Sequence, residues 1–585
     1  MIPVLFCLLL AAPRYTLPDA VQPVKHTMEL TIDPAKETFS GIARIDIRMT
    51  GPQREIWVNA RGLTVSEAHF EVAGKSIPAK TTMAGGEFLG LGSEMPLTVR
   101  DATVVIQYTA PLSATSSTGP YHAKTGDDWY AFTTFTPTDA RRAFPSFDEP
   151  RFKTPWEISI CVPSNAKAFT NAPEVSAIEQ PNGWTLHKFA QTKPIAAEVV
   201  AFAAGPFDVY EGTAAGVKAI PIRVLTARGD ASRGKQAAIE TAAILPRLEH
   251  YTGIPYPWEK LDHVALPRSA FGAVENPGLI TYGSRGLLTA PPASIRSLQA
   301  HEIGHQWFGN LVTQATWTDV WLSEGFATWF ASRTMDEEQP ADRKHLAAVI
   351  ARERIMQTDD GDKTRPIRLA KQTREELGSV YHQIVYQKGG ALLHMLENWL
   401  GEDNLQRGLR DYLARHAYES ATTEDLENAL KMASPVDPTA VMDSYLNTTG
   451  VARVAIDIRC DGEPVMTVRR VSGKTSTPVC WKTGSQSGCN VVADEPRKIA
   501  LQACPAWVFP NRGGSGYYRT AWTPAQLYQI AAALPELNGA ERLTLLFDLK
   551  AMNTAETKAL LSTLANDAQP EIAKAAKVAL GLEKE

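Results

Sequence analysis

At 585 residues the chain is several times longer than an ordinary domain, so about three or four hydrophobic cores are expected. A hydrophobic fraction of 44% with 21% charged residues is typical of globular proteins and excludes extensive disorder. The formal net charge of -5, without blocks of like charge, leaves no basic surface for nucleic acid or anionic lipid.

The N-terminus begins with an apolar run, Ile2 to Ala12, that is too short to span a bilayer but has the length of a signal-peptide core. We therefore predict a signal peptide and leader over residues 1–24, with export to the periplasm or the medium. The run lacks a basic segment before it, and Pro13 follows Ala12. A misassigned start or an apolar arm is the alternative, which would leave the protein cytoplasmic. No other segment has the sequence pattern of a transmembrane anchor.

Alternation of apolar and polar residues predicts a β-rich domain over residues 25–214. Every second residue from Arg44 to Met49 is apolar, and glycines and prolines that favour turns separate such runs. This period of two places the apolar side chains on one face of a sheet.

Helical spacing of apolar residues replaces the alternation in residues 215–449 and predicts a mainly α domain there. Four segments carry the pattern most clearly: Lys235–Tyr251, Ile295–Leu311, Trp321–Met335 and Gln383–Leu400. The residues suited to metal binding and acid–base chemistry lie in this part of the chain.

Alternation returns after Gly450 and predicts a small β domain over residues 450–520, with Val454, Ile456 and Ile458 on one face. Thr523 followed by Pro524 is typical of a helix N-terminus, so residues 521–585 should form a short helical segment. The whole chain is thus expected to be a multidomain α+β protein.

Four of the six cysteines lie in the small β domain: Cys460, Cys480, Cys489 and Cys504. One or two disulfides there would fit an oxidising compartment. Buried free thiols are the alternative, and the spacing does not determine the pairing. A zinc site is disfavoured because no CxxC pair occurs.

The string HEIGH, from His301 to His305, lies in a helical pattern, and the spacing of four residues puts both imidazoles on one face, about one turn apart. Both can therefore bind one zinc ion, and Glu302 between them can act as general base on a metal-activated water. Two histidines held by hydrogen bonds on a structural helix are the alternative. Glu324, at the start of the next apolar-faced helix, argues against it because a His, His, Glu set leaves the fourth zinc position open to water.

The longer string from Leu298 to Trp329, LQAHEIGHQWFGNLVTQATWTDVWLSEGFATW, resembles the zinc signature of the aminopeptidase N-like metallopeptidases, the gluzincin aminopeptidases that include leukotriene hydrolase. The resemblance covers nearly the whole chain after residue 25. It implies an N-terminal β saddle, a thermolysin-like catalytic domain, a small β-sandwich and a helical segment, in the order predicted above. It also implies one Zn2+ per chain, held by His301, His305 and Glu324.

Upstream, Gly272-Ala273-Val274-Glu275-Asn276 is similar to the family's GAMEN motif, with valine in place of methionine. By resemblance, Glu275 binds the substrate's free α-amine, and Gly272, Ala273 and Asn276 belong to the same amine-binding segment. A carboxylate near the zinc gives an N-terminal ammonium a partner that an internal peptide bond does not need. Without the motif, Glu275 would be an ordinary loop carboxylate.

Downstream, the string YQKGG, from Tyr386 to Gly390, resembles the family's YxKG string. The tyrosine of that string hydrogen-bonds the oxyanion of the tetrahedral intermediate. Tyr386 is therefore the expected oxyanion donor. Tyr381 is the nearby alternative.

One motif departs from the family. The segment from Thr133 to Pro150, TTFTPTDARRAFPSFDEP, is very similar to a motif that usually begins TQFE, but Thr134 and Thr136 stand where relatives have glutamine and glutamate. In relatives those two side chains help to form the amine pocket and the first specificity pocket. The protein is therefore expected to hold the ammonium with less negative charge.

These features predict a zinc metallo-aminopeptidase that cleaves the first bond of peptides with a free N-terminus by attack of a zinc-activated water, with Glu302 as general base. A zinc endopeptidase, or an exopeptidase for modified N-termini, is the alternative that Thr134 and Thr136 leave open. A metal-free peptide-binding scaffold is the alternative from another class of protein. No nucleic-acid partner is predicted, and the preferred first residue, the physiological peptide and the oligomeric state stay open.

Overall fold

The structure is a computed structural model that describes residues 12–369, 377–552 and 554–584. Of the predicted signal peptide and leader over residues 1–24, residues 1–11 lie outside the described residues, and β1 begins within the remainder, at Val21. The chain forms two compact units. The first contains Met1–Trp317, Gln372–Leu377 and His416–Ala421, and the second contains Thr318–Lys371, Gly378–Arg415 and Thr422–Glu585. Among the described helices, none combines the length and the apolar composition that a membrane crossing requires.

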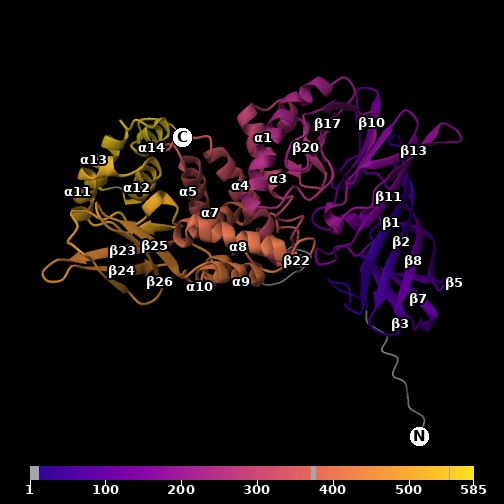
Figure 1. Cartoon of the computed structure of the whole chain (residues 1–585), viewed down its shortest axis with the longest axis horizontal. Helices are drawn as coiled ribbons and strands as arrows, with labels where there is room; N and C mark the ends of the chain where they lie inside the picture. The colour runs from indigo at the N-terminus through magenta and orange to yellow at the C-terminus, as the bar shows by residue number, and fades with distance from the viewer. Residues whose placement is uncertain (1–11, 370–376, 553, 585) are drawn as a thin grey trace, which may run out of the picture. The chain divides into compact units, whose positions relative to one another are not determined.

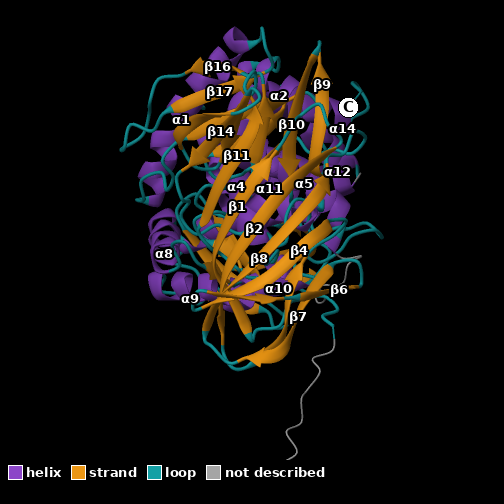
Figure 2. Ribbon diagram, turned by 90° about the vertical axis from the view of Figure 1, so that its right-hand side faces the viewer, coloured by secondary structure: helices purple, strands orange, loops and turns teal. Residues whose placement is uncertain are grey.

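An eight-stranded sheet forms the N-terminal part of the first unit, and Figure 2 shows its long strands β1, β2, β8 and β4 side by side. In spatial order its strands are β13 (Glu174–Gln180), β14 (Trp184–Phe189), β11 (Trp156–Pro163), β1 (Val21–Thr31), β2 (Thr38–Met49), β8 (Asp101–Pro111), β4 (Thr64–Val72) and β5 (Lys75–Pro78). All neighbouring pairs are antiparallel except β1 with β11. Ile45 and Ile47 of β2 are buried, while Arg44 and Asp46 between them are half-buried. The predicted alternation is confirmed.

Two smaller sheets complete this β-rich part. One has the order β3 (Gln53–Asn59), β7 (Phe88–Leu97), β6 (Lys80–Ala84), and the other has the order β12 (Lys167–Thr170), β15 (Phe202–Gly205), β10 (Asp128–Thr134), β9 (Gly119–Thr125). Tyr121 and Phe132 of the second sheet, with Phe207 just after β15, pack in one core with Leu225 and Val264 of the sheet that follows in the chain. One hydrophobic core therefore joins these two sheets of the first unit.

That following sheet was not among the predicted elements. Its five strands, in order, are β16 (Asp208–Glu211), β17 (Ile222–Thr226), β18 (Leu261–Leu266), β20 (Leu279–Gly283) and β19 (Ala273–Val274). All of β18 is buried, so it lacks the alternation that reveals a half-exposed strand. Helix α1 (Lys235–Thr252) packs against β17 and α3 (Pro292–Gly304) (Figure 1). The short helix α2 (Ser284–Leu288) also contacts α1 and α3. Two short strands, β21 (Thr313–Gln314) and β22 (Ser420–Ala421), pair with each other.

The second unit begins with helices. They are α4 (Trp321–Asp336), α5 (Leu346–Asp359), α7 (Gln383–Leu400), α8 (Glu402–Arg415), α9 (Thr423–Ala433) and α10 (Thr439–Asn447). Three of the predicted helical segments thus correspond to α1, α4 and α7 within two residues at each end. The helix of the fourth segment, around the histidines, ends earlier than predicted.

The small β domain and the C-terminal helices form the rest of the second unit. One sheet has the order β27 (Arg497–Ala500), β24 (Val465–Ser472), β23 (Ala452–Arg459), β28 (Tyr518–Thr520), and β25 (Thr477–Lys482) pairs with β26 (Ser487–Val492). The helices are α11 (Pro524–Ala532), α12 (Gly539–Met552), α13 (Ala555–Leu564) and α14 (Pro570–Ala579). Thr523 caps α11 in a capping box with Gln526, and Pro524 is the first helical residue, as predicted.

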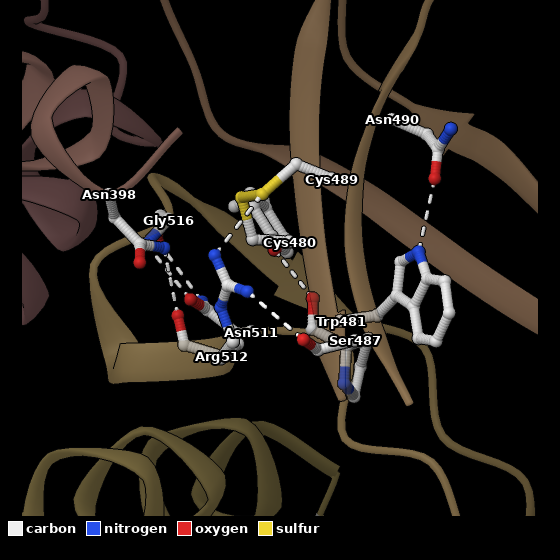
Figure 3. Close-up of a disulfide and its surroundings, with 11 residues drawn as sticks. Asn398, Cys480, Trp481, Ser487, Cys489, Asn490, Asn511, Arg512 and Gly516 are labelled. Carbon is white, nitrogen blue, oxygen red and sulfur yellow. Dashed lines mark hydrogen bonds between the residues drawn. A yellow bond between two sulfur atoms is a disulfide. The ribbon is translucent and has the colours of Figure 1, made fainter. Parts of the chain in front are cut away.

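Two disulfides hold the small β domain. Cys460 pairs with Cys504, and Cys480 pairs with Cys489 across the β25–β26 hairpin. Figure 3 shows the second bridge with the Arg512 guanidinium beside it, donating toward the Cys489 sulfur at 3.5 Å. The predicted disulfides are therefore present, with a pairing that the spacing could not determine.

Removing the Cys460–Cys504 bridge by a pair of serine substitutions should destabilise this domain more than removing Cys480–Cys489. The first bridge closes a sequence separation of 44 residues and the second one of 9. In the chain-entropy model, closing these loops adds about 4 and about 2.6 kcal/mol, respectively, to the free energy of unfolding. Native-state hydrogen exchange of the amides in β23 to β27 measures the two losses. The reverse order would show that loop closure does not set the contribution of these bridges.

Candidate metal centre

The two histidines of the HEIGH string face each other at the end of α3. Their Nε2 atoms are 3.1 Å apart and the ring planes cross at 86°. His305 is 1% exposed, and His301 is half-buried. The backbone amide of His305 donates to the carbonyl of His301, so the one-turn relation holds although the helix stops here. One end of each imidazole is thus directed at a shared point.

Helix α3 ends at Gly304, and the prediction that it continues to Leu311 is wrong. After the end of the helix, two backbone hydrogen bonds span five residues instead of four. The amide of Asn310 donates to the carbonyl of His305, and the amide of Leu311 donates to the carbonyl of Gln306. Gly309 has a φ of 118°, which is open to glycine and strained for other residues. The chain therefore turns sharply just beyond the second histidine.

The histidine pair fits a zinc ion by its donor chemistry. With Zn–N bonds of about 2.0–2.1 Å, two ligands of a tetrahedral ion lie about 3.3 Å apart, close to the observed 3.1 Å. The second nitrogen of His305, Nδ1, lies 3.2 Å from the carbonyl of Phe308. That contact favours a proton on Nδ1 and leaves Nε2 as the ligand atom.

Two carboxylates lie beside His305. Glu302 is 4% exposed and Glu275 is half-buried. One ligand-type atom from each of Glu275, Glu302 and His305 lies within 4.8 Å of the other two. The predicted base and the predicted amine-binding carboxylate are thus brought together with one predicted metal ligand.

The segment that carries Glu275 is the edge of the five-stranded sheet. Ala273 lies in β19, where it pairs with Tyr282 of β20. The carbonyl of Gly272 accepts from the amide of Gly283 at 2.9 Å, and Asn276 is buried. Around Glu275, Gly272 and Ala273 thus pair through their backbone with β20 and its end, and Asn276 is the buried residue.

Two side chains missed by the sequence reasoning fix Glu275. The side-chain amides of Gln306 and Asn310 both donate to its carbonyl, at 2.9 Å and 2.7 Å. Gln306 also donates to the carbonyl of Glu302 at 3.2 Å. Both residues lie within the zinc signature directly after His305, and that position was the only sequence signal for a supporting role. The turn after α3 thereby holds the segment that carries Glu275 in place.

In the second unit, Glu324 lies in the first turn of α4 and is 3% exposed, and Tyr386 is half-buried in the first turn of α7. The two helices approach so closely that a Cβ on Gly389 would lie 3.1 Å from the Cα of Gly325. Gly325 directly follows Glu324, and Gly389 lies in the same YQKGG string as Tyr386. The glycines of the two motifs therefore allow the close helix contact that sets Glu324 relative to Tyr386.

Lys388 of the YQKGG string is a buried structural cation. Its ammonium lies 2.9 Å from Asp359, with both side chains 0% exposed, and it donates to the carbonyl of Thr448 at 2.8 Å. Tyr517 also donates to Asp359, at 3.1 Å. Burial lowers the pKa of Lys388, and the carboxylate of Asp359 opposes this. The lysine ties α7 to the end of α5, two residues from Tyr386.

Replacing Lys388 by methionine should lower the free energy of unfolding by about 3–5 kcal/mol, because Asp359 would be left buried without its cation. Urea denaturation measures the loss. The double variant Lys388→Met, Asp359→Asn should lose less than the single one, since no buried charge remains. Equal losses in both variants would show that the ion pair is not what the substitution disrupts.

Thr134 and Thr136 are both buried, at and just after the end of β10. Neither supplies the negative charge of the glutamate that relatives carry in this motif. The departure seen in the sequence therefore lies inside the first unit and not on an exposed loop.

Two family models match the chain, one in its N-terminal β-rich part and one in the part that carries the histidines. Residues 22–197 match the Peptidase M1 N-terminal domain, and residues 237–445 match the Peptidase family M1 domain. "Aminopeptidase 2" of Candida albicans is 30% identical over 553 residues, which cover 89% of this chain and 58% of the relative. "Aminopeptidase A" of Gloydius brevicauda is 29% identical, with 87% and 57% covered, and "Glutamyl aminopeptidase" of Sus scrofa is 28% identical, with 93% and 62% covered. The chain thus spans less than two thirds of the length of these relatives.

Proposed function

The chain belongs to peptidase family M1, and on this premise we propose that it is a zinc metallo-aminopeptidase acting on peptides with a free N-terminus. The observation that carries the proposal is the 3.1 Å pair of Nε2 atoms on His301 and His305, with Glu302 and Glu275 beside it. A ligand pair, a base and a partner for an ammonium are thus grouped. Glu324 is proposed as the third ligand of one zinc ion because the signature joins it to the histidines.

Each of the proposed site residues has a separate role in the reaction. A zinc ion held by the proposed ligands would polarise the first carbonyl of the substrate and lower the pKa of a water at its open position to about 7. Glu275 binds the α-ammonium and so fixes which peptide bond is presented. Glu302 takes a proton from the attacking water and passes it to the leaving nitrogen. Tyr386 donates a hydrogen bond to the developing oxyanion.

Initial rates on a peptide with a free amine and on its acetylated twin, with and without a metal chelator, test this function. We expect cleavage of the free-amine peptide alone, loss of that cleavage with chelator, and recovery on adding zinc. Equal cleavage of both peptides would favour an endopeptidase. A zinc content near zero after gentle purification would favour a non-catalytic scaffold.

An exopeptidase for modified N-termini is the second candidate, and Thr134 and Thr136 favour it. If the missing negative charge weakens amine binding, Thr136→Glu should lower KM for a simple aminoacyl substrate about tenfold, the scale of one charge-assisted hydrogen bond. Thr138→Glu is the matched control and should leave KM unchanged. A Thr136→Glu enzyme with an unchanged KM would refute this role for the threonines.

We also propose that the protein works in an oxidising compartment, in the periplasm or outside the cell. The two disulfides support this, because such bonds are rare in reducing cytosol. The domain limits proposed are 25–214, 215–449, 450–520 and 521–585.

A further inference from the structure

A buried carboxylate near the amine-binding segment has no role in the mechanism above. Glu198, in the 3-10 helix η2 (Ala197–Val199), is 3% exposed. Its Oε2 atom has no hydrogen-bond partner within the part of the chain that the structure describes. A buried polar group without a partner destabilises the fold, and more so when it is charged. Native structures keep few such groups, and those they keep often serve function.

Hydrogen bonds tie η2 to the segment that carries Glu275. The side-chain amide of Asn171 donates to the carbonyl of Val199 and to the carbonyl of Pro277, at 2.9 Å in both cases. Val199 directly follows Glu198, and Pro277 is two residues after Glu275. One buried asparagine therefore holds together the two backbone segments from which these carboxylates extend.

Lys153, whose positive charge acts on Glu198, donates its hydrogen bonds to other groups. The Lys153 ammonium donates to the carbonyls of Asn310, Leu311 and Glu419, at 2.7, 3.0 and 3.3 Å. An ammonium has three hydrogens, so these three carbonyls use all of them. Lys153 thus attracts Glu198 through space, while the buried Oε2 atom stays without a hydrogen-bond donor among the described residues.

The charges around Glu198 also favour an added cation. Burial above all, and then repulsion by Asp148 and Glu275, raises the pKa of Glu198 to about 8 against the opposing effects of its own backbone amide and of Lys153. Asp148 is already paired with Arg141 at 2.7 Å. An ammonium placed between Glu198 and Glu275 would relieve their repulsion and favour the ionised form of Glu198.

We propose that Glu198 is a second carboxylate for the substrate's N-terminal ammonium, acting with Glu275 to select peptides that have a free amine. This inference rests on the proposed function and adds a specificity-determining residue to it. Thr136 stands where resembling enzymes have glutamate, and Glu198 supplies from η2 the negative charge that this segment lacks.

The test compares Glu198→Gln with Glu179→Gln, a control that changes an exposed glutamate of β13. For an aminoacyl p-nitroanilide, Glu198→Gln should raise KM about tenfold while kcat changes less than about threefold. The second readout is the ratio of inhibition constants for an aminoacyl hydroxamate and its des-amino analogue. Glu198→Gln should reduce the preference for the amine about tenfold, and Glu179→Gln should leave it unchanged.

A merely structural role would weaken both inhibitors equally, so an unchanged ratio in Glu198→Gln overturns the inference. If that variant does not fold, the same ratio is measured in Glu198→Asp, whose carboxylate is one methylene shorter. A wild-type ratio there overturns the inference as well. If the wild-type enzyme itself has no preference for the amine, the proposed function fails, and that result is distinct from a failure of Glu198 alone.

Discussion

Replacing Glu302 by glutamine should lower kcat about 10²- to 10⁴-fold, the range that a positioned general base contributes. Glutamine keeps the size of the side chain and loses the ability to accept a proton from water. Glu302 is not one of the proposed metal ligands, so the zinc content should stay that of the wild type. Steady-state rates on an aminoacyl p-nitroanilide and metal analysis of the same sample measure both quantities.

The matched control for this substitution is Glu259→Gln, a carboxylate in the same unit that has no part in the proposed mechanism. It should keep wild-type rates. Cleavage that Glu302→Gln retains and that a chelator does not affect would show that the reaction takes place elsewhere or by other chemistry.

Replacing Tyr386 by phenylalanine should lower kcat about 10²- to 10³-fold, as the loss of one oxyanion donor does in other hydrolases. The effect should fall on kcat more than on KM, because the hydrogen bond forms as charge develops on the oxygen. Tyr386 lies in the first turn of α7, which the close contact of Gly325 with Gly389 packs on α4. Phenylalanine keeps the ring that packs there.

Tyr381→Phe is the control for Tyr386, since it removes a phenol from the same motif region. It should change kcat less than about threefold, which is within the spread expected for a substitution away from the developing charge. If Tyr381→Phe produced the large loss and Tyr386→Phe did not, the two tyrosines would exchange roles.

The histidine spacing was sufficient to predict that His301 and His305 face one point, because a separation of four residues is nearly one turn of helix. It could not show that α3 stops at Gly304. Apolar residues continue at helical spacing to Leu311, although the helix itself ends at Gly304. Periodicity reports which side of a segment is buried and does not report its backbone hydrogen bonds.

The five-stranded sheet was missed for a related reason. Strand β18, with the sequence LDHVAL, is buried along its whole length although it contains Asp262 and His263, so its sequence shows neither the alternation of a half-exposed strand nor a continuous apolar run. The sheet matters to the site because its edge strand β19 leads directly into Glu275. Motif resemblance located Glu275, while its support by Gln306 and Asn310 depends on a turn whose shape the sequence pattern did not reveal.

Contacts between segments far apart in the sequence were the features that the sequence predicted least. The Lys388–Asp359 ion pair, the contact of Gly325 with Gly389 and the Cys460–Cys504 disulfide each join segments distant in the sequence. No local spacing encodes them. The sequence indicated their residue types, such as cysteines in one domain and a glycine pair in YQKGG, and the fold determined which partners meet.

Zinc stoichiometry is the sharpest check on the proposed metal centre. The purified protein should contain one zinc per chain, Glu302→Gln should contain the same amount, and Glu324→Ala should retain far less after dialysis. Activity and zinc content should fall together in the Glu324 variant. A wild-type enzyme that cleaves free-amine peptides without bound metal, or a Glu324→Ala variant with full zinc and full activity, would contradict this account.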